Sequence, residues 1–302
     1  MTGGKTRQKM HADELDIDEE LVERLVAAQF PQWAGLPVVR VESAGTDNAM
    51  YRLGADLVVR LPRIPGAAHQ VEKEQRWLPR LAPALPLQVP VPLCKGVPGE
   101  GFPMAWSVYR WLEGANAFDE PIADLPHAAV TLGRFVVALR KVDADGGPRS
   151  FRGGPLSSRD DDVRLAIRDL GADGTLDAAA ATEAWETALA LPQWQGAPVW
   201  VHGDLLPGNL LARGGRLSAV IDFGAVGVGD PACDTIPAWT LLDAGTRDLF
   251  RAEADVDNAT WGRGRGWALC FGLTAYHYYR VTNPALAAVG LRSVTEILAA
   301  RG

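Results

Sequence analysis

Residues 199–211 read VWVHGDLLPGNLL, and residues 219–224 read AVIDFG. Within these two stretches Asn209 comes five positions after Asp204, and Asp222 comes thirteen positions after Asn209. An apolar run precedes each of the two aspartates, and such short runs beside turn residues are typical of buried strands. We expect the two strands to be neighbours, so that their ends bring two carboxylates and one amide into the same space.

This set of side chains suits phosphoryl transfer from a nucleoside triphosphate. The charge of the triphosphate must be neutralised by Mg²⁺, a hard cation that takes oxygen ligands. One carboxylate and the amide oxygen can hold the ion, while the other carboxylate orients and deprotonates the attacking hydroxyl. DFG alone is a weak signal, whereas HGDxxxxN followed by IDFG at this spacing is specific.

With this motif the sequence resembles the aminoglycoside phosphotransferase family, whose fold is similar to that of the protein kinases. The resemblance extends over roughly residues 20–290. It implies that Asp204 is the catalytic aspartate and that Asn209 and Asp222 are the ligands of Mg²⁺. It also implies ATP or GTP as the phosphate donor.

Further residues of this region resemble positions of the same family. His202 corresponds to a structural organiser of the catalytic loop, not to a proton shuttle. Residues 229–234 (GDPACD) are similar to a downstream segment whose last aspartate, here Asp234, braces the catalytic loop. For Asp230 and Asp234 the structural alternative is capping of a following helix. We expect a scaffold role for both.

The resemblance also assigns nucleotide binding to the N-terminal part of the chain. Arg60, in the run VVRLP, stands where kinases carry a phosphate-binding lysine, so the sequence departs here from the commoner pattern. Arginine is a rigid fork and lysine a compact charge, although both bind phosphate oxygens. An exposed strand arginine is the alternative. Glu74 is the expected ion-pair partner of Arg60, with Glu72 as its competitor, and Arg63 competes with Arg60.

A loop from Ser43 to Met50 is expected to cover the phosphates. It contains Gly45 and no GxGxxG, so it matches neither a dinucleotide-binding loop nor the glycine loop of protein kinases. Its backbone amides and the hydroxyl of Ser43 or Thr46 could contact phosphate, and a simple hairpin turn is compatible with that role. Tyr109, in the expected hinge, could pack on the nucleotide base; core packing is an equal alternative.

The hydrophobic pattern divides the chain into a sheet-rich part and a helix-rich part. We expect an α+β fold with two lobes, similar to the protein kinases, with an antiparallel-sheet N-lobe and a mostly helical C-lobe. The expected boundaries are 13–106 for the nucleotide-binding N-lobe, 107–114 for the hinge and 115–302 for the helical C-lobe with the catalytic loop and acceptor site.

Periodicity also predicts individual elements. The expected strands are 38–42, 49–53, 57–61, 89–93, 104–109, 210–212 and 218–222. The expected helices are one that Asp18 caps, one over 67–81 that Pro79 bends or shortens, and 128–142, 160–170, 176–191, 232–242, 243–252 and 261–280.

Composition excludes several classes of protein. The net charge of −7 argues against a nucleic-acid binder, which needs a basic face. No apolar run approaches the ~18 residues that span a bilayer, and the first residues lack the apolar region of a signal peptide. The three cysteines lie far apart, so neither a disulfide framework nor a zinc site is indicated. We therefore expect a cytoplasmic protein with no nucleic-acid or membrane partner.

The family resemblance implies a kinase for a small hydroxylated acceptor, such as a cationic aminoglycoside or another antibiotic. One alternative is a metabolic kinase of the same fold that acts on a sugar or an amino alcohol. Another is a non-catalytic nucleotide-binding protein, which the complete set of Asp204, Asn209 and Asp222 argues against.

Two groups of residues bear on the acceptor, and each has a structural alternative. Acidic side chains could pair with substrate amines or form a solvated surface: Asp160, Asp161, Asp162, Asp243, Glu253, Asp255 and Asp257. Aromatic side chains near the end could line a pocket for a macrolide or belong to the core: Trp261, Trp267, Tyr276, Tyr278 and Tyr279.

Overall fold

The computed structural model describes residues 15–41 and 47–299, which form two compact units. Unit 1 holds the described residues up to 80 together with 90–112, and unit 2 holds 81–89 together with those from 113 onward. The expected boundaries of the lobes and of the hinge stay a prediction. An antiparallel sheet in unit 1 and many helices in unit 2 confirm the α+β fold class.

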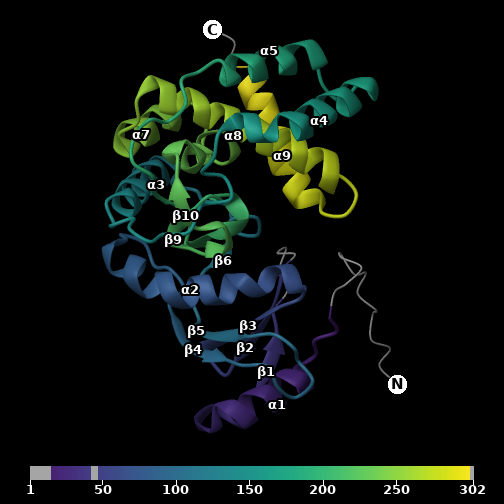
Figure 1. The fold of residues 1–302 in the computed structure, drawn as a ribbon, viewed down its shortest axis with the longest axis vertical. Helices are drawn as coiled ribbons and strands as arrows, with labels where there is room; N and C mark the ends of the chain where they lie inside the picture. The colour runs from purple at the N-terminus through teal and green to yellow at the C-terminus, as the bar shows by residue number, and fades with distance from the viewer. Residues whose placement is uncertain (1–14, 42–46, 300–302) are drawn as a thin grey trace. The chain divides into compact units, whose positions relative to one another are not determined.

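In its described part, unit 1 contains a five-stranded antiparallel sheet in the order β1-β2-β3-β5-β4 (Figure 1). The strands are β1 (Val38–Arg40), β2 (Asn48–Leu53), β3 (Leu57–Pro62), β4 (Pro92–Gly96) and β5 (Trp106–Arg110). The helices are α1 (Glu19–Gln29) and α2 (Ala68–Leu81). Asp18 caps α1 as predicted, because its Oδ1 accepts from the backbone N–H of Leu21 at 2.8 Å.

The core of unit 1 forms where alternate side chains of the sheet meet the apolar stripe of α1. Tyr51 and Val59 are directly paired across β2 and β3, and both are fully buried with Leu25 of α1. Val59 pairs in turn with Val108 of β5, and Arg60 with Ser107. The position of Arg60 is thereby fixed in the central strand of the sheet.

Two expectations for unit 1 were wrong in detail. Strand β4 covers Pro92–Gly96 and not 89–93. Pro90, inside the expected range, has no N–H to donate to a sheet, whereas Pro92 stands at the first position of the strand, where a proline is tolerated. Gln88, just before this segment, instead accepts from the backbone N–H of Val220 at 3.0 Å. Helix α2 continues through Pro79 to Leu81, so the proline does not shorten it, and a bend at Pro79 stays a prediction.

Unit 2 is mostly helical. Its helices are α3 (Leu125–Arg140), α4 (Asp160–Ala172), α5 (Ala178–Leu189), α6 (Pro237–Thr240), α7 (Ala244–Ala254), α8 (Asn258–Tyr279) and α9 (Pro284–Ala299). Its strands are β6 (Ala115–Asn116), β7 (Val199–Val201), β8 (Leu210–Arg213), β9 (Arg216–Val220) and β10 (Gly227–Gly229), and they pair as β10-β7 and as β6-β8-β9.

Helices α8 and α9 run side by side in unit 2 (Figure 1). They approach closely because two glycines meet: a Cβ on Gly272 would lie 2.8 Å from the carbonyl oxygen of Gly290. Helix α8 is buried over most of its length, with Trp267 and Phe271 among its buried side chains. Within the described residues, no helix has the length and apolar character needed to cross a membrane.

Two expectations for unit 2 also differ from the structure. The helix expected over 232–242 is divided into a 3₁₀ turn (Pro231–Thr235) and the short α6, because Pro237 has no N–H for a continuous helix. Helix α9 was not expected at all. Its small and apolar residues pack against α8, and this tertiary contact supplies much of the stability of such a helix.

Candidate active site

The predicted catalytic aspartate, Asp204, lies in the loop that follows β7. The chain turns at Gly203, whose φ of +78° is a conformation that glycine adopts without strain. The 3₁₀ turn Pro207–Asn209 then brings Asn209 back to Asp204, and Asn209 Nδ2 donates to Asp204 Oδ2 at 2.8 Å and to the Asp204 carbonyl at 2.9 Å. Two of the three predicted site residues of unit 2 are therefore in direct contact.

Asp222 reaches the same region from β9. The backbone N–H of Ile221 donates to the carbonyl oxygen of Asn209 at 2.9 Å, so the residue before Asp222 is bonded to the predicted partner ligand. Asp222 itself has a left-handed backbone with φ +58°, and its Oδ1 accepts from the N–H of Gly224 at 3.3 Å. Aspartate tolerates this conformation better than most residues do.

The expectation of two neighbouring strands was wrong. Strand β7 pairs with β10, whereas β9 pairs with β8, so the two strands before the aspartates belong to different sheets. Asn209 brings the two segments together, because its side chain bonds to Asp204 and its carbonyl bonds to Ile221. The hydrogen bonds of a loop thus replace the expected strand pairing.

His202 and Asp234 hold the loop through buried hydrogen bonds. Asp234 accepts from the backbone N–H of His202 at 2.7 Å and from that of Gly203 at 2.8 Å. The ring of His202 accepts at Nδ1 from the N–H of Asp204 at 3.2 Å, so Nε2 is the nitrogen that donates to the carbonyl of Ile221 at 3.1 Å. Burial raises the pKa of Asp234, and the two N–H donors oppose that rise.

Asp230 has a different contact from that of Asp234. Its carboxylate accepts two hydrogen bonds from Arg263, at 2.7 Å from Nε and at 3.1 Å from Nη2, and both side chains are buried. It also accepts from the N–H of Ala232 at 3.0 Å and so caps the turn that leads to Asp234. These contacts agree with the scaffold role expected for it.

The donor atoms of Asn209 and Asp222 are of the kind that suits a Mg²⁺ ion with further ligands from nucleotide phosphate. The amide nitrogen of Asn209 makes both of its hydrogen bonds to Asp204, and within the described chain its oxygen accepts none. No group of three or more His, Cys, Asp or Glu residues in the described chain could hold a metal ion by itself. One amide and one carboxylate suit Mg²⁺, which keeps waters and takes phosphate oxygens as further ligands.

In unit 1, the predicted ion pair between Arg60 and Glu74 is present. Arg60 Nη1 lies 2.6 Å from Glu74 Oε1, and their side chains are 11% and 1% exposed. Arg60 Nη2 also donates to Gln70 Oε1 at 3.4 Å. The competitor Glu72 is 64% exposed and pairs instead with Lys95.

Tyr109 is a buried partner of Glu74. Its hydroxyl donates to Glu74 Oε2, and its side chain is buried. Burial, followed by the charge of Glu74, raises the pKa of Tyr109 well above the ordinary value, so the phenol keeps its proton. This arrangement favours core packing, the alternative to packing on the nucleotide base. Ser43, Gly45 and Thr46 lie outside the described residues.

The acidic side chains weighed for substrate amines mostly have structural partners. Asp243 and Asp257 cap α7 and α8, accepting from backbone N–H groups at 2.9 and 2.6 Å. Asp160 accepts from Trp185 Nε1 at 2.8 Å, and Arg164 is also 2.8 Å away. Of the aromatic residues, Trp267 is buried while Tyr278 is exposed.

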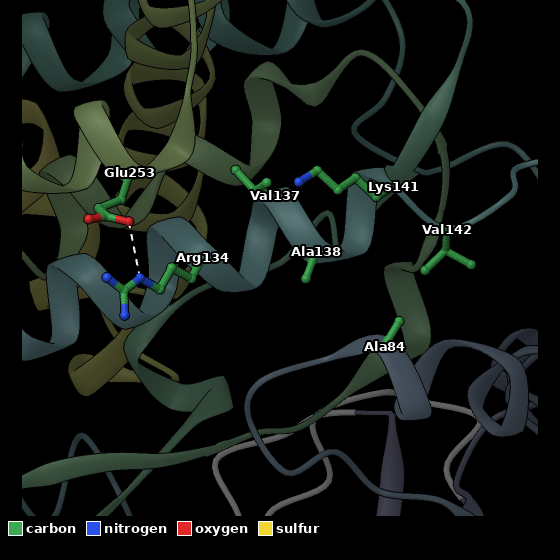
Figure 2. Close-up of a pocket in the computed structure, with 7 residues that line it drawn as sticks. All are labelled: Ala84, Arg134, Val137, Ala138, Lys141, Val142 and Glu253. Atoms are coloured by element: carbon green, nitrogen blue, oxygen red, sulfur yellow. Dashed lines mark hydrogen bonds and ion pairs between the residues drawn. The ribbon is translucent and has the colours of Figure 1, made fainter.

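Glu253 lines a hollow along α3 (Figure 2). The hollow has a volume of about 620 Å³, and its lining residues are Ala84, Arg134, Val137, Ala138, Lys141, Val142 and Glu253. Figure 2 shows the side chain of Arg134 turned to Glu253, with Arg134 Nε 3.1 Å from Glu253 Oε2. None of the predicted site residues lines it.

Sequence reasoning missed Arg152, which contacts Asp204 directly. Arg152 Nη1 donates to Asp204 Oδ1 and, at 2.7 Å, to the carbonyl oxygen of Gly203. Burial by itself would lower the pKa of the guanidinium, but the charge of Asp204 outweighs it and raises that pKa. Arg152 lies in the segment between α3 and α4, 52 positions before Asp204, and its sequence context carries no phosphotransferase motif.

The fold and this set of side chains define a phosphotransferase with a protein-kinase-like structure. The sequence profile of the phosphotransferase enzyme family (APH) matches residues 38–267. The match spans most of the chain, and the chain therefore belongs to this family. Among curated proteins, none matches the sequence significantly.

Solved structures share the fold at low sequence identity. The GDP complex of an aminoglycoside 2'-phosphotransferase-IIIa variant has a TM-score of 0.74 and 20% identity, covering 93% of this chain and 98% of its own. The macrolide 2'-phosphotransferase MphH from Brachybacterium faecium has a TM-score of 0.62 and 24% identity, covering 92% and 98%. ADP-bound APH(2'')-Ib has a TM-score of 0.59 and 16% identity, covering 93% and 97%. These neighbours confirm the kinase-like fold.

Proposed function

We propose that this phosphotransferase transfers the γ-phosphate of ATP or GTP to a hydroxyl of an aminoglycoside-like or other antibiotic acceptor, with Asp204 as the catalytic aspartate. The observation that best supports this proposal is the contact between Asp204 and Asn209. One amide nitrogen fixes the Asp204 carboxylate, while the oxygen of the same amide accepts no hydrogen bond in the described chain. A base and a metal ligand are thereby held in a fixed relation.

Each residue then has a defined task. Asp204 orients the acceptor hydroxyl and takes its proton as the oxygen attacks phosphorus. Asn209 and Asp222 would hold Mg²⁺, which when bound supplies positive charge to the phosphate oxygens. Arg60, held by Glu74, binds triphosphate oxygens. His202 and Asp234 keep the catalytic loop in shape and take no part in proton transfer.

The identity of the acceptor draws its support from the structural neighbours. One neighbour, of 19% identity, was solved with GDP and kanamycin, and another, of 18% identity, with gentamicin. A macrolide phosphotransferase is also among them. We therefore propose an antibiotic of one of these two classes as acceptor, and a cytoplasmic location, where nucleoside triphosphates are supplied. A sugar or amino alcohol is the second candidate, because the same fold accommodates a metabolic kinase.

The first experiment measures Mg²⁺-dependent release of ADP or GDP by a coupled assay, with aminoglycosides, macrolides, sugars and amino alcohols as acceptors. We expect stimulation by one antibiotic class, and we expect Asp204→Ala to lower kcat about a hundredfold or more, because a positioned general base is lost. Nucleotide affinity, measured by calorimetry, should stay close to that of the wild type.

Asp248→Asn is the matched control, since Asp248 is an exposed carboxylate of α7 and should leave kcat unchanged. Full activity of Asp204→Ala would remove Asp204 from the reaction. Stimulation by sugars or amino alcohols alone would favour the metabolic kinase. Nucleotide binding with no turnover for any acceptor would favour the binding protein.

A further inference from the structure

Arg152 belongs to a short segment, residues 148–153, which we call the strap. The strap contacts the loop that carries Asp204. The backbone of the strap pairs with β10: the N–H of Val228 donates to the carbonyl of Pro148 at 2.7 Å, and the N–H of Ser150 donates to the carbonyl of Val228 at 3.1 Å. The N–H of Asp230 donates to the carbonyl of Gly153 at 2.9 Å. The strap is therefore fixed along residues that follow Asp222.

Glycines and one hydroxyl bring the strap into close contact with the loop of Asp204 and with the residues that follow Asp222. A Cβ on Gly229 would lie 2.4 Å from the Gly153 carbonyl, and one on Gly203 would lie 2.8 Å from Ser150 Oγ. The hydroxyl of Ser150 donates to the carbonyl of Ala225 at 3.1 Å. The strap thus touches the loop of Asp204 on one side and the residues after Asp222 on the other.

From this fixed segment Arg152 reaches the carboxylate that the proposed reaction needs. Arg152 Nη1 bonds to Asp204 Oδ1 while Asn209 Nδ2 bonds to Asp204 Oδ2, so each carboxylate oxygen has one donor. The side chains of Arg152 and Asp204 are 18% and 25% exposed, which leaves the carboxylate open on one side. Each oxygen has further lone pairs, which can accept a hydrogen bond from the hydroxyl of the substrate.

The guanidinium group of Arg152 makes few other contacts within the described residues. In the described part of the chain its Nε and Nη2 atoms make no hydrogen bond, and besides Asp204 and Gly203 it lies near the ring of Phe151, 5.6 Å from the centroid. Removing the charged group should therefore act mainly on the catalytic loop. A charge-assisted hydrogen bond is stronger than a neutral one and holds a carboxylate in one rotamer.

We propose that Arg152 is a positioning residue for the phosphoryl transfer. Together with Asn209 it holds the Asp204 carboxylate in one orientation, in which the carboxylate can take the proton of the substrate hydroxyl. This inference rests on the proposed function. A misplaced catalytic group costs far more in rate than in binding, because only the reacting geometry is affected. Arg152 therefore contributes to kcat and not to the affinity for the nucleotide.

The test uses the full chain and compares Arg152→Met, Arg152→Lys and Arg152→Ala with the matched control Arg149→Met. Arg149 is an exposed arginine of the same strap, and its side chain makes no hydrogen bond or ion pair within the described residues. We expect Arg152→Met to lower kcat by about tenfold to a hundredfold with the nucleotide KM changed by less than about threefold. Arg152→Lys should recover part of kcat, guanidinium ions should restore part of the activity of Arg152→Ala, and Arg149→Met should behave as wild type.

A double substitution separates positioning from a purely structural role. If Arg152 acts through Asp204, adding Arg152→Met to Asp204→Asn should lower kcat no further, within about twofold. A further loss as large as in the wild-type background would overturn the proposal, as would a kcat for Arg152→Met equal to that of Arg149→Met.

Crystal structures of the wild type and of Arg152→Met test the positioning role without an activity assay. We expect the Asp204 carboxylate to leave its wild-type rotamer in the variant, and an unchanged rotamer would overturn the positioning role. If the wild type turned over no nucleotide with any acceptor, the proposed function would fail while this structural comparison still stood.

Discussion

The loop of Asp204 in unit 2 and the Arg60 network of unit 1 both hold buried charges, but the groups that donate hydrogen bonds to those charges differ. Asp234 accepts from two backbone N–H groups, and Gly203 provides one of them. Glu74 accepts from two side chains, Arg60 on β3 and Tyr109 on β5. Asp204 therefore depends on the shape of a loop, whereas the orientation of Arg60 depends on the charge of one partner on a regular helix.

The largest effect should come from the loop. Asp234→Ala leaves two buried backbone N–H groups without acceptors, which costs about 2–5 kcal/mol of unfolding free energy and shifts Asp204 from its place. We expect little or no transfer activity and a much lower Tm, measured by calorimetry. Asp234→Asn keeps one acceptor oxygen and should retain more stability. A folded, fully active Asp234→Ala would show that the loop does not depend on its backbone contacts.

The network of unit 1 should respond to charge. Glu74→Gln keeps the shape of the side chain but leaves Arg60 beside a neutral amide. We expect a loss of about 1.5–3 kcal/mol of unfolding free energy, the contribution of a hydrogen bond to a charged group, and a nucleotide KM about tenfold higher. Glu72→Gln is the matched control, because Glu72 is exposed and its pair with Lys95 is worth at most about 1 kcal/mol. Equal effects of the two substitutions on KM would remove Arg60 and Glu74 from nucleotide binding.

The smallest effect is expected for Tyr109→Phe, which tests whether Tyr109 belongs to the core or contacts the nucleotide. Tyr109→Phe removes the hydroxyl that donates to Glu74, and a hydrogen bond to a charged group contributes about 1.5–3 kcal/mol. Arg60 still satisfies the other oxygen of Glu74, so we expect a loss near the lower end of that range. The nucleotide KM should stay within about twofold, because the ring remains in the core. A clear rise in KM with unchanged Tm would place Tyr109 on the nucleotide after all.

The sequence predicted those contacts that regular elements or short motifs determine. Asp204 and Asn209 are five residues apart and meet through one turn, so their spacing was informative. Glu74 lies on the helix after the strand of Arg60, where the family resemblance placed the ion-pair partner, and the structure selects it over Glu72. The antiparallel pairing of β2 and β3 followed from two short apolar runs that are separated by a brief turn.

The contacts that were missed depend on irregular segments. Arg152 meets Asp204 across 52 positions of sequence, and the strap that carries it is held by backbone bonds that no residue pattern encodes. The pairing of β7 with β10 could not be read from two apolar runs, because every short apolar strand has several possible neighbours. Acidic residues near α7 and α8 looked available for a substrate, although Asp243 and Asp257 cap those helices.

The left-handed backbone of Asp222 also limits how this enzyme can evolve. For residues other than glycine, asparagine and aspartate, that conformation costs roughly 1–2 kcal/mol. A glutamate that kept the charge would therefore weaken the fold while displacing its carboxylate by one methylene. Asparagine is the substitution that the backbone accepts, and it removes the charge. With the metal-binding role proposed for Asp222, lineages that retain activity should keep aspartate at this position, while inactive descendants should most often carry asparagine or glycine there.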